Sequence, residues 1–207
     1  TGAGNDTVNI SLLAGQDGAF VLNTEAGDDH VYAHGRDAQA TGTVALPYST
    51  LPLIVFGGAG KDVIYGGHGD DLLFGDRGNA AFFTQSLDSS DLDTSSPQQL
   101  AQAAGATVVG NAGVGDRSDG IVRSLGLAFT VNAEVGDNDL IYGREGRDII
   151  FGGAGRDTLD AAADDVQADS IVGDHGVALF VGGVLVDVRT TDPSAGAGDK
   201  ITAGKGR

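Results

Sequence analysis

The sequence predicts an all-β fold, a solenoid of short stacked strands interrupted by β-hairpin and short-helix insertions. The main observation is a regular spacing: Asp139, Asp148 and Asp157 lie nine residues apart, and each is followed two positions later by a large apolar residue. The second observation is composition, since 35 of the 207 residues are glycine while cysteine, methionine and tryptophan are absent. Such a chain builds thin aliphatic layers rather than one central core, so we expect residues 1–207 to form a single elongated body.

Each nine-residue unit, which we call a nonad, reads as a six-residue turn followed by a three-residue strand with one inward apolar side chain. In residues 152–160, glycines at the first, second and fourth places permit the positive φ of a tight turn and leave carbonyl oxygens uncovered. Calcium binds about six to eight oxygen atoms, which carbonyls and one carboxylate from each of two stacked turns can supply. The spacing therefore predicts calcium sites between stacked turns.

Three nonads, residues 57–65, 66–74 and 152–160, match GGxGxDxUx, with U a large apolar residue, at every defined position. Degenerate copies cover 1–9, 24–32 and 195–202. The pattern resembles the RTX (repeats-in-toxin) or hemolysin-type calcium-binding repeat family. The resemblance implies a right-handed parallel β-roll in which two nonads, about eighteen residues, make one coil and calcium lies between a turn and the next turn on the same edge.

The resemblance also implies several Ca²⁺ ions as cofactor, held by aspartates of the turns and by turn residues that offer backbone carbonyls. By its spacing rule, Asp139 and Asp157 share one edge of the roll and Asp148 lies on the other. The alternative, in which Gly-Asp pairs form Asx turns without metal, needs no strict nine-residue register. The predicted metal ligands are Asp6, Asp29, Gly57, Ala59, Asp62, Gly66, His68, Asp71, Asp76, Asp139, Gly143, Glu145, Asp148, Gly152, Ala154, Asp157, Asp174 and Asp199.

The nonads come in short runs, so some sites must be completed differently or lost. One turn of the roll beyond Asp62 and Asp71, the sequence has Ala80 and Ser89 instead of aspartates. Two Gly-Asp dipeptides follow the runs and lead into apolar strands, and we expect their carboxylates, Asp76 and Asp174, to cap or complete metal sites. Because these dipeptides lie roughly a hundred residues apart, they suggest a repeating module of that length.

The segments between the runs carry other signals. Alternating apolar residues around Gly182 and Gly183 predict a β-hairpin, and residues 125–131 and 44–56 predict longer strands beside the solenoid. The predicted nonad runs lie near 1–9, 24–32, 57–78, 135–160 and 195–207, and the predicted insertions are 33–56, 79–134 and 161–194.

Helical signals occur in two insertions. Ser96, Pro97 and Gln99 form a capping box with proline at the first helical position, which predicts a surface helix from Pro97 to Ala104 that ends at Gly105. Residues 88–93 before it predict an exposed polar loop. A weaker pattern at 160–167 suggests a second short helix.

Charge and motifs exclude several functions. The net charge of −17, from 29 acidic and 12 basic residues, argues against nucleic acid, whose phosphates such a surface repels. The sequence has neither a GxSxG motif nor a phosphate-binding Gly-x₄-Gly-Lys-Ser/Thr loop.

Without calcium the crowded aspartates repel one another and glycine-rich turns are costly to order, so we expect the metal-free chain to be largely unfolded.

The remaining candidates for chemistry have simpler explanations. We expect His30 and His34 to share no face in a strand and turn, which argues against zinc. Paired carboxylates at 28–29 and 70–71 fall at the fifth and sixth places of nonads, where metal ligation explains them, and the pair at 164–165 suits a solvated loop. We therefore predict that the chain is not an enzyme.

Two functional classes remain open. Sites of this kind fill at about millimolar, extracellular calcium, and no signal peptide, membrane-spanning run or lipidation motif is visible. The nonad register places the next aspartate after Arg207, so we expect the chain to be a segment of a larger secreted bacterial repeat protein. Proteins that resemble the RTX family are typically exported by type I secretion. The favoured function is a calcium-rigidified structural or adhesive segment of the cell surface or of an extracellular filament, with assembly between copies or binding of a matrix ligand. The alternative is a noncatalytic accessory module of a secreted enzyme or toxin.

Overall fold

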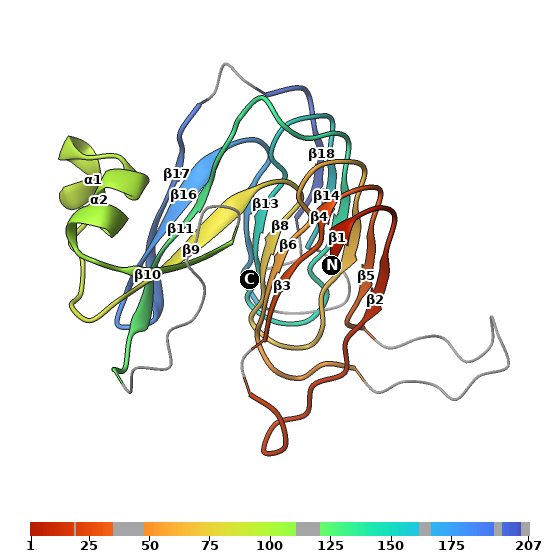
Figure 1. Ribbon diagram of the computed structural model, residues 1–207, viewed down its shortest axis with the longest axis horizontal. Helices are drawn as coiled ribbons and strands as arrows, with labels where there is room; N and C mark the ends of the chain where they lie inside the picture. Colours follow the sequence, from red (N-terminus) through yellow and green to blue (C-terminus); the bar gives the residue numbers. More distant parts are fainter. Residues whose placement is uncertain (19, 35–47, 111–120, 162–166, 193–195, 204–207) are drawn as a thin grey trace, which may run out of the picture.

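The computed structural model describes the chain except residues 19, 35–47, 111–120, 162–166, 193–195 and 204–207. Most of its strands belong to three sheets, which lie side by side in Figure 1. Sheets 1 and 2 are parallel and enclose a shared interior, and sheet 3 is antiparallel and packs on the outer side of sheet 2. The predicted all-β class is confirmed, with two short helices beside sheet 3.

The parallel sheets consist of very short strands. Sheet 1 contains β2 (Thr7–Asn9), β5 (His30–Tyr32), β7 (Val63–Tyr65), β12 (Leu140–Tyr142), β14 (Thr158–Asp160) and β18 (Lys200–Thr202). Sheet 2 contains β3 (Phe20–Asn23), β6 (Leu53–Phe56), β8 (Leu72–Phe74), β13 (Ile149–Phe151) and β15 (Ser170–Val172). The short strands β1 (Gly2–Ala3) and β4 (Glu25–Ala26) pair within the turns. Along the chain these strands alternate between sheets 1 and 2, and we call each successive pair a coil.

The interior between sheets 1 and 2 is filled by the central residues of β7, β8, β12, β13 and β14, together with Leu53 and Val55 of β6. Ile64, Ile141 and Leu159 of sheet 1 are completely buried, as are Leu73 and Ile150 of sheet 2. Each of these residues follows an aspartate by two positions, as the nonad pattern predicts. The period of the sequence therefore alternates a polar turn with one buried aliphatic residue.

Sheet 3 is built entirely from insertions between coils. The first insertion forms β9 (Gly78–Phe83), α1 (Asp91–Thr94), α2 (Pro97–Ala103), β10 (Thr107–Gly110) and β11 (Ser124–Thr130). The second forms the predicted hairpin of β16 (Gly176–Val181) and β17 (Val184–Thr190). Strands β11 and β16 pair, with Leu127 opposite Leu179, so one sheet unites the two insertions.

The coils continue across the first insertion without a gap. Strand β12 pairs with β7, so that Leu140 lies opposite Val63, and β13 pairs with β8 in the same way. The chain therefore returns to the position at which it left the parallel sheets. This return explains why Ala80 and Ser89 are not aspartates, because both residues lie in the insertion and not in the next coil.

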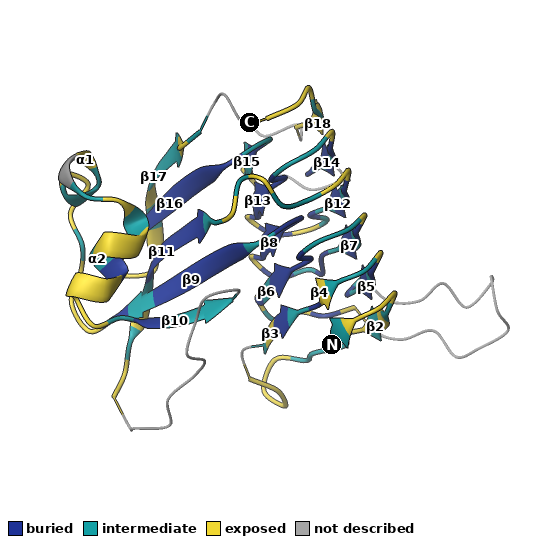
Figure 2. Cartoon of the chain, turned by 45° about the horizontal axis from the view of Figure 1, so that its top comes forward, coloured by how far each residue is buried: buried dark blue, intermediate teal, exposed yellow. Residues whose placement is uncertain are grey.

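Two further apolar layers hold sheet 3 in place, and Figure 2 shows β9, β11 and β16 as largely buried. Toward sheet 2, the rings of Phe56, Phe74 and Phe151 stack in sequence at 4.8 Å and pack with Ala128 and Ala178 of sheet 3. The far side of sheet 3 packs beneath α2 in a separate cluster. The molecule thus has three thin apolar layers instead of one core.

The local signals for the helix are confirmed. The Ser96 hydroxyl accepts the N–H of Gln99, the Gln99 side chain accepts the N–H of Ser96, and α2 begins at Pro97. Gly105 follows the helix with φ of 60°. The predicted polar loop at 88–93 is partly wrong, because Asp88 accepts the N–H of Ser90 and a single helical turn, α1, begins at Asp91.

Other local predictions differ from the structure or fall outside it. Residues 53–56, assigned to an insertion, form β6 and pair with both β3 and β8 inside sheet 2. Residues 44–47 of the predicted strand and 162–166 of the predicted second helix lie outside the described residues, and Asp160 belongs to β14. The sequence pattern placed β6 beside the solenoid instead of inside it, because no aspartate lies two positions before its inward residues Leu53 and Val55.

A row of rings lies on sheet 1. Tyr32, Tyr65 and Tyr142 stack with centroid separations of 5.4 and 4.7 Å, and the guanidinium of Arg144 lies 5.2 Å from the last two rings. His30 and His34 both contact Tyr32. The expectation that these histidines share no face is therefore wrong, because side chains two and four residues apart in an extended chain point the same way.

Replacing Phe74 with alanine tests the layer between sheets 2 and 3. Phe74 is completely buried between two stacked rings. We expect Phe74→Ala to lower the free energy of unfolding by about 3–5 kcal/mol, measured by denaturant unfolding in saturating calcium. Val122→Ala, at a side chain that is 89% exposed, is the control and should leave stability unchanged. Equal stability of the two variants would contradict the packing described.

Candidate calcium-binding turns

The predicted ligands gather along two edges where the chain crosses between the parallel sheets. We define edge A as the crossings from sheet 2 to sheet 1, which include the turns 57–62 and 152–157, and edge B as the opposite crossings, which include 66–71 and 143–148. Asp139 and Asp157 lie on edge A and Asp148 lies on edge B. The prediction that the first two share an edge is confirmed.

A ladder of aspartates connects the coils along edge A. Each aspartate donates its backbone N–H to Oδ1 of the aspartate in the next coil, at donor–acceptor distances of 2.7–3.0 Å. The members in order are Asp6, Asp29, Asp62, Asp139, Asp157 and Asp199. Their separations along the chain range from 18 to 77 residues, so the ladder keeps its spatial period whatever the length of the insertion.

Edge B has a shorter ladder. Asp71 accepts the N–H of Leu53 and donates its own N–H to Asp148, and Asp148 donates to Asp169, each at 2.9 Å. The sequence analysis missed Asp169, although the residue precedes Ile171 by two positions and so carries the aspartate-to-apolar spacing of a nonad. The residues before Asp169 lack the glycines of a nonad, so the repeat pattern did not identify this aspartate.

The second carboxylate oxygen of the edge A aspartates has a different environment. Oδ2 of Asp29, Asp62, Asp139 and Asp157 is buried and has no hydrogen-bond partner among the described residues. Burial, with smaller contributions from neighbouring carboxylates, raises the pKa of Asp62 and Asp157 to about 7 and that of Asp139 to about 10. Ionising a buried carboxyl group that has no partner is costly. A cation bound at these oxygens would stabilise the ionised form.

Backbone carbonyls from the next coil approach the same oxygens. A Cβ added to Gly57 would collide with the carbonyl oxygen of Gly75 and with Oδ2 of Asp62. The same pair of oxygens, one carboxylate and one carbonyl of the following coil, faces Gly75 and Gly152 on edge A and Gly66 on edge B. Each first-place glycine therefore leaves room between two oxygen donors.

This geometry corrects one detail of the sequence analysis. The first-place glycines do not have positive φ, so space and not backbone conformation requires them. In the turns 57–62 and 152–157 the second and fourth places do have positive φ, with 109° at Gly58 and 124° at Gly60, whereas Gly67 and Gly69 of the turn 66–71 do not. Arg144, a non-glycine residue at a second place, also has φ of 81°, which shows that the turn imposes this conformation.

The third-place residues behave less uniformly. The side chains of His68 and Glu145 pair with each other at 3.3 Å on the surface of edge B and do not join the buried oxygens. The carbonyl of Ala59 accepts the N–H of Gly27, and the N–H of Ala154 is donated to Asp76. Their carbonyls, like that of Gly143, which lies against Gly66, stay predicted ligands of these sites.

The degenerate coil at 24–29 replaces a glycine with a hydroxyl. Thr24 occupies the first place, and its Oγ1 donates to the carbonyl of Gly57. In the following coils the equivalent carbonyls, those of Gly75 and Gly152, each lie against a glycine and an aspartate Oδ2. Asp29 therefore keeps its position in the ladder, but the space beside it holds a protein hydroxyl.

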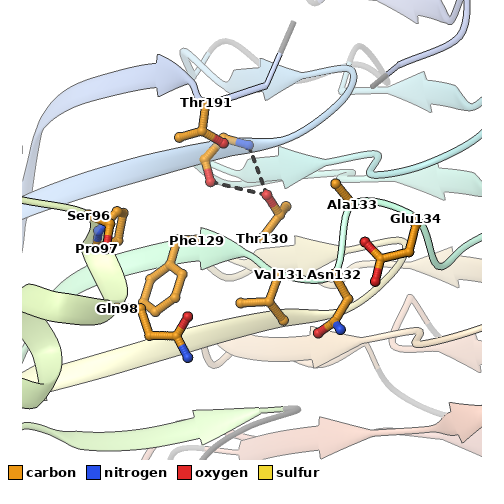
Figure 3. Close-up of a pocket in the computed structure, with 11 residues that line it drawn as sticks. Ser96, Pro97, Gln98, Phe129, Thr130, Val131, Asn132, Ala133, Glu134 and Thr191 are labelled. Carbon is orange, nitrogen blue, oxygen red and sulfur yellow. Dashed lines mark hydrogen bonds between the residues drawn. The ribbon is translucent and has the colours of Figure 1, made fainter. Parts of the chain in front are cut away.

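A hollow elsewhere in the molecule offers a different set of groups. It has a volume of about 510 Å³ and lies between the start of α2 and the ends of β11 and β16 (Figure 3). Thr130 accepts the N–H of Gly176 at 3.0 Å, so it joins the two insertions. The polar lining includes one carboxylate, Glu134, beside the carboxamides of Gln98 and Asn132. These groups make a junction between elements and do not match the donor pairs of the turns.

The donors of edges A and B suit a hard cation. Within the described part of the chain, no three His, Cys, Asp or Glu side chains come together as a metal-binding group, whereas carboxylate and carbonyl oxygens meet at Gly57, Gly66, Gly75 and Gly152. Calcium accepts such all-oxygen sets, including many backbone carbonyls. The fold and the turns thus define a calcium-binding repeat protein.

Comparison with known families agrees with this class. The family model described as RTX calcium-binding nonapeptide repeat (4 copies) matches residues 54–80 and 135–168, which contain the turns described above. These segments are RTX calcium-binding nonapeptide repeats, and the predicted family is confirmed. No curated protein and no solved structure matches the chain.

The raised pKa values predict how the metal-free chain responds to pH. In the folded state Asp62 and Asp157 titrate near pH 7 instead of the ordinary value of 3.8. Between these values the folded chain binds more protons than the unfolded chain, so its stability falls as pH rises. We expect circular dichroism in chelator to show more β-structure at pH 4.5 than at pH 8. Calcium should reverse the trend, because the ion binds ionised carboxylates, and greater β-content at pH 8 in chelator would contradict the burial of these groups.

Proposed function

We propose that this chain is a calcium-binding structural segment whose coils form a right-handed parallel β-roll that folds and becomes rigid when calcium binds. The observation that carries the proposal is the row of buried Oδ2 atoms without hydrogen-bond partners along edge A. Those of Asp62, Asp139 and Asp157 each lie beside a carbonyl of the next coil, so one ion would bind oxygens from two coils at once. The binding free energy of the ions would then contribute directly to folding.

The proposed ligands follow from this arrangement and add the carbonyls of Gly75 and Gly173 to the predicted set. On edge A the ions would be held by Asp62 with Gly75, by Asp139 with Gly152 and by Asp157 with Gly173, and on edge B by Asp71 with Gly143. Asp148 and Asp199 continue the two rows, and Asp6 and Asp29 begin the first one. The remaining carbonyls of the first and third places would complete the coordination.

Substitution of the ladder aspartates tests the proposed sites. Asp139→Ala and Asp157→Ala each remove a buried carboxylate from one of two neighbouring sites on edge A, so each should lower the calcium affinity of its site by at least about 10-fold. The measurement is a calcium titration followed by circular dichroism together with metal counting. Asp88→Ala, in the exposed segment before α1, is the control and should leave the titration unchanged.

The same titration tests coupled folding. The native protein should gain its β-sheet signal as calcium is added and should lose it in chelator at neutral pH. A complete β-sheet signal without calcium would contradict coupled folding, and the absence of bound calcium at millimolar concentration would contradict the function itself.

The setting we propose is extracellular, on the surface of a bacterium or in its matrix, after type I secretion. Calcium there is abundant enough to fill such sites, and a net charge of −17 suits a surface that calcium partly neutralises. Among the helices of the described residues, none has the length and apolar character needed to cross a bilayer. In this setting the segment would act as a rigid spacer or adhesive rod of a longer array.

Assembly between copies distinguishes the rod from an accessory module of a secreted enzyme or toxin. Strands β18 and β2 form opposite edges of sheet 1, so a second copy could extend the sheet by adding a strand. We expect the native protein to form longer particles in calcium, as measured by sedimentation velocity, and to dissociate in chelator. A species that stays monomeric at high concentration in calcium would favour the accessory role.

A further inference from the structure

Both insertions leave and re-enter the roll within a turn of edge A. The first leaves after Gly75 and Asp76 and returns through residues 136–139, and the second leaves after Gly173 and Asp174 and returns through residues 196–199. In each case one segment supplies the first place of the turn, and a distant segment supplies the aspartate at the sixth place. We call these two crossings the split turns.

The first split turn contains a carboxylate that intact nonad turns lack. Asp76 takes the second place, which is glycine in the full nonads, and is 2% exposed. Its Oδ2 accepts the N–H of Ala154 in the next coil, while its Oδ1 is buried without a hydrogen-bond partner among the described residues. The side chain is therefore fixed in place with one oxygen still available to a ligand.

The returning segment is shaped around this carboxylate. A Cβ at Gly136 would collide with both oxygens of Asp76, and one at Gly153 would collide with Oδ2. Oδ2 of Asp139, which lies against Gly75, is a second buried oxygen without a partner in the same turn. The departing and returning segments thus bring two buried carboxyl groups together.

The second split turn repeats the arrangement. Oδ1 of Asp174 is buried without a hydrogen-bond partner among the described residues, and a Cβ at Gly196 would collide with that atom. Oδ2 of Asp199 lies against Gly173, as Oδ2 of Asp139 lies against Gly75. The two crossings are therefore built alike although their insertions have different lengths and structures.

We propose that Asp76 and Asp174 bind calcium at the split turns, and that these ions join the departing and returning ends of each insertion. Calcium at these positions closes the turns from which β9, β11, β16 and β17 extend, so occupancy of the split turns is linked to docking of sheet 3 on sheet 2. Because a site with an extra carboxylate attracts the ion more strongly, the split turns should hold their calcium more tightly than the intact turns. The inference rests on the proposed calcium-binding function and adds a second class of site to it.

The test compares Asp76→Asn with the native protein. Asparagine keeps the shape of the side chain and an oxygen that can accept the N–H of Ala154, but it removes the charge. We expect this variant to bind at least one calcium fewer, or to bind its tightest ion at least about 10-fold more weakly, by metal counting and calorimetry. In saturating calcium, hydrogen exchange of β9 and β11 should rise more than that of β7 and β12.

Two further variants keep the test decisive. Asp174→Asn, at a less buried position, should produce the same loss with faster exchange of β16 and β17, which covers the case in which Asp76→Asn does not fold. Asp88→Asn is the matched control, since that carboxylate also accepts a backbone N–H, that of Ser90 at 2.9 Å, but is exposed and far from the turns, and the variant should bind the native number of ions.

The possible failures are distinguishable. If the native protein binds no calcium, the proposed function is wrong. If the native protein binds calcium while Asp76→Asn and Asp174→Asn keep its number and affinity of ions, the split-turn sites are wrong and the function stands. If the variants lose ions without faster exchange in sheet 3, the link to docking is wrong.

Discussion

The structure depends on carboxylates buried between stacked turns. Along edge A, Asp62, Asp139 and Asp157 each use one oxygen to accept the N–H of the preceding coil and keep the other in a space shared with a carbonyl of the following coil. The first interaction fixes the register of the strands, and the second creates a local charge that the protein alone does not balance. Thin aliphatic layers between three-residue strands bury little area per coil, so the fold relies on whatever neutralises this charge.

The sequence revealed the parts of the fold that local chemistry determines. The aspartate-to-apolar spacing identified the strands β7, β8, β12, β13 and β14 and the edges on which their aspartates lie, and the capping box identified α2. The partners of the strands of sheet 3 could not be predicted, because pairing of β11 with β16 depends on how two distant insertions meet. Asp169 was missed, and β6 was assigned to a position outside the parallel sheets, because each lacks one half of the nonad pattern.

The largest gap in the prediction was the continuity of the coils. A rule counted along the chain places Ala80 and Ser89 at the next turns, whereas the ladder connects Asp62 to Asp139 over 77 residues. Adding residues to a loop costs little extra entropy once its ends are fixed, so a long insertion can interrupt the sequence period and leave the spatial period intact. The chain leaves the coils at the Gly-Asp dipeptides. It returns at Gly136 and Gly196, which lie against the side chains of Asp76 and Asp174.

The direction of the aspartate ladder makes the two ends of the stack chemically different. Every carboxylate points toward the earlier coil and every N–H toward the later one, so one end of the stack offers acceptors and the other offers donors. Two copies that met through identical ends would place like groups in contact. In the assembly proposed above, copies would therefore join head to tail, which is a heterologous contact, and growth by such contacts would give polar fibres instead of symmetric pairs.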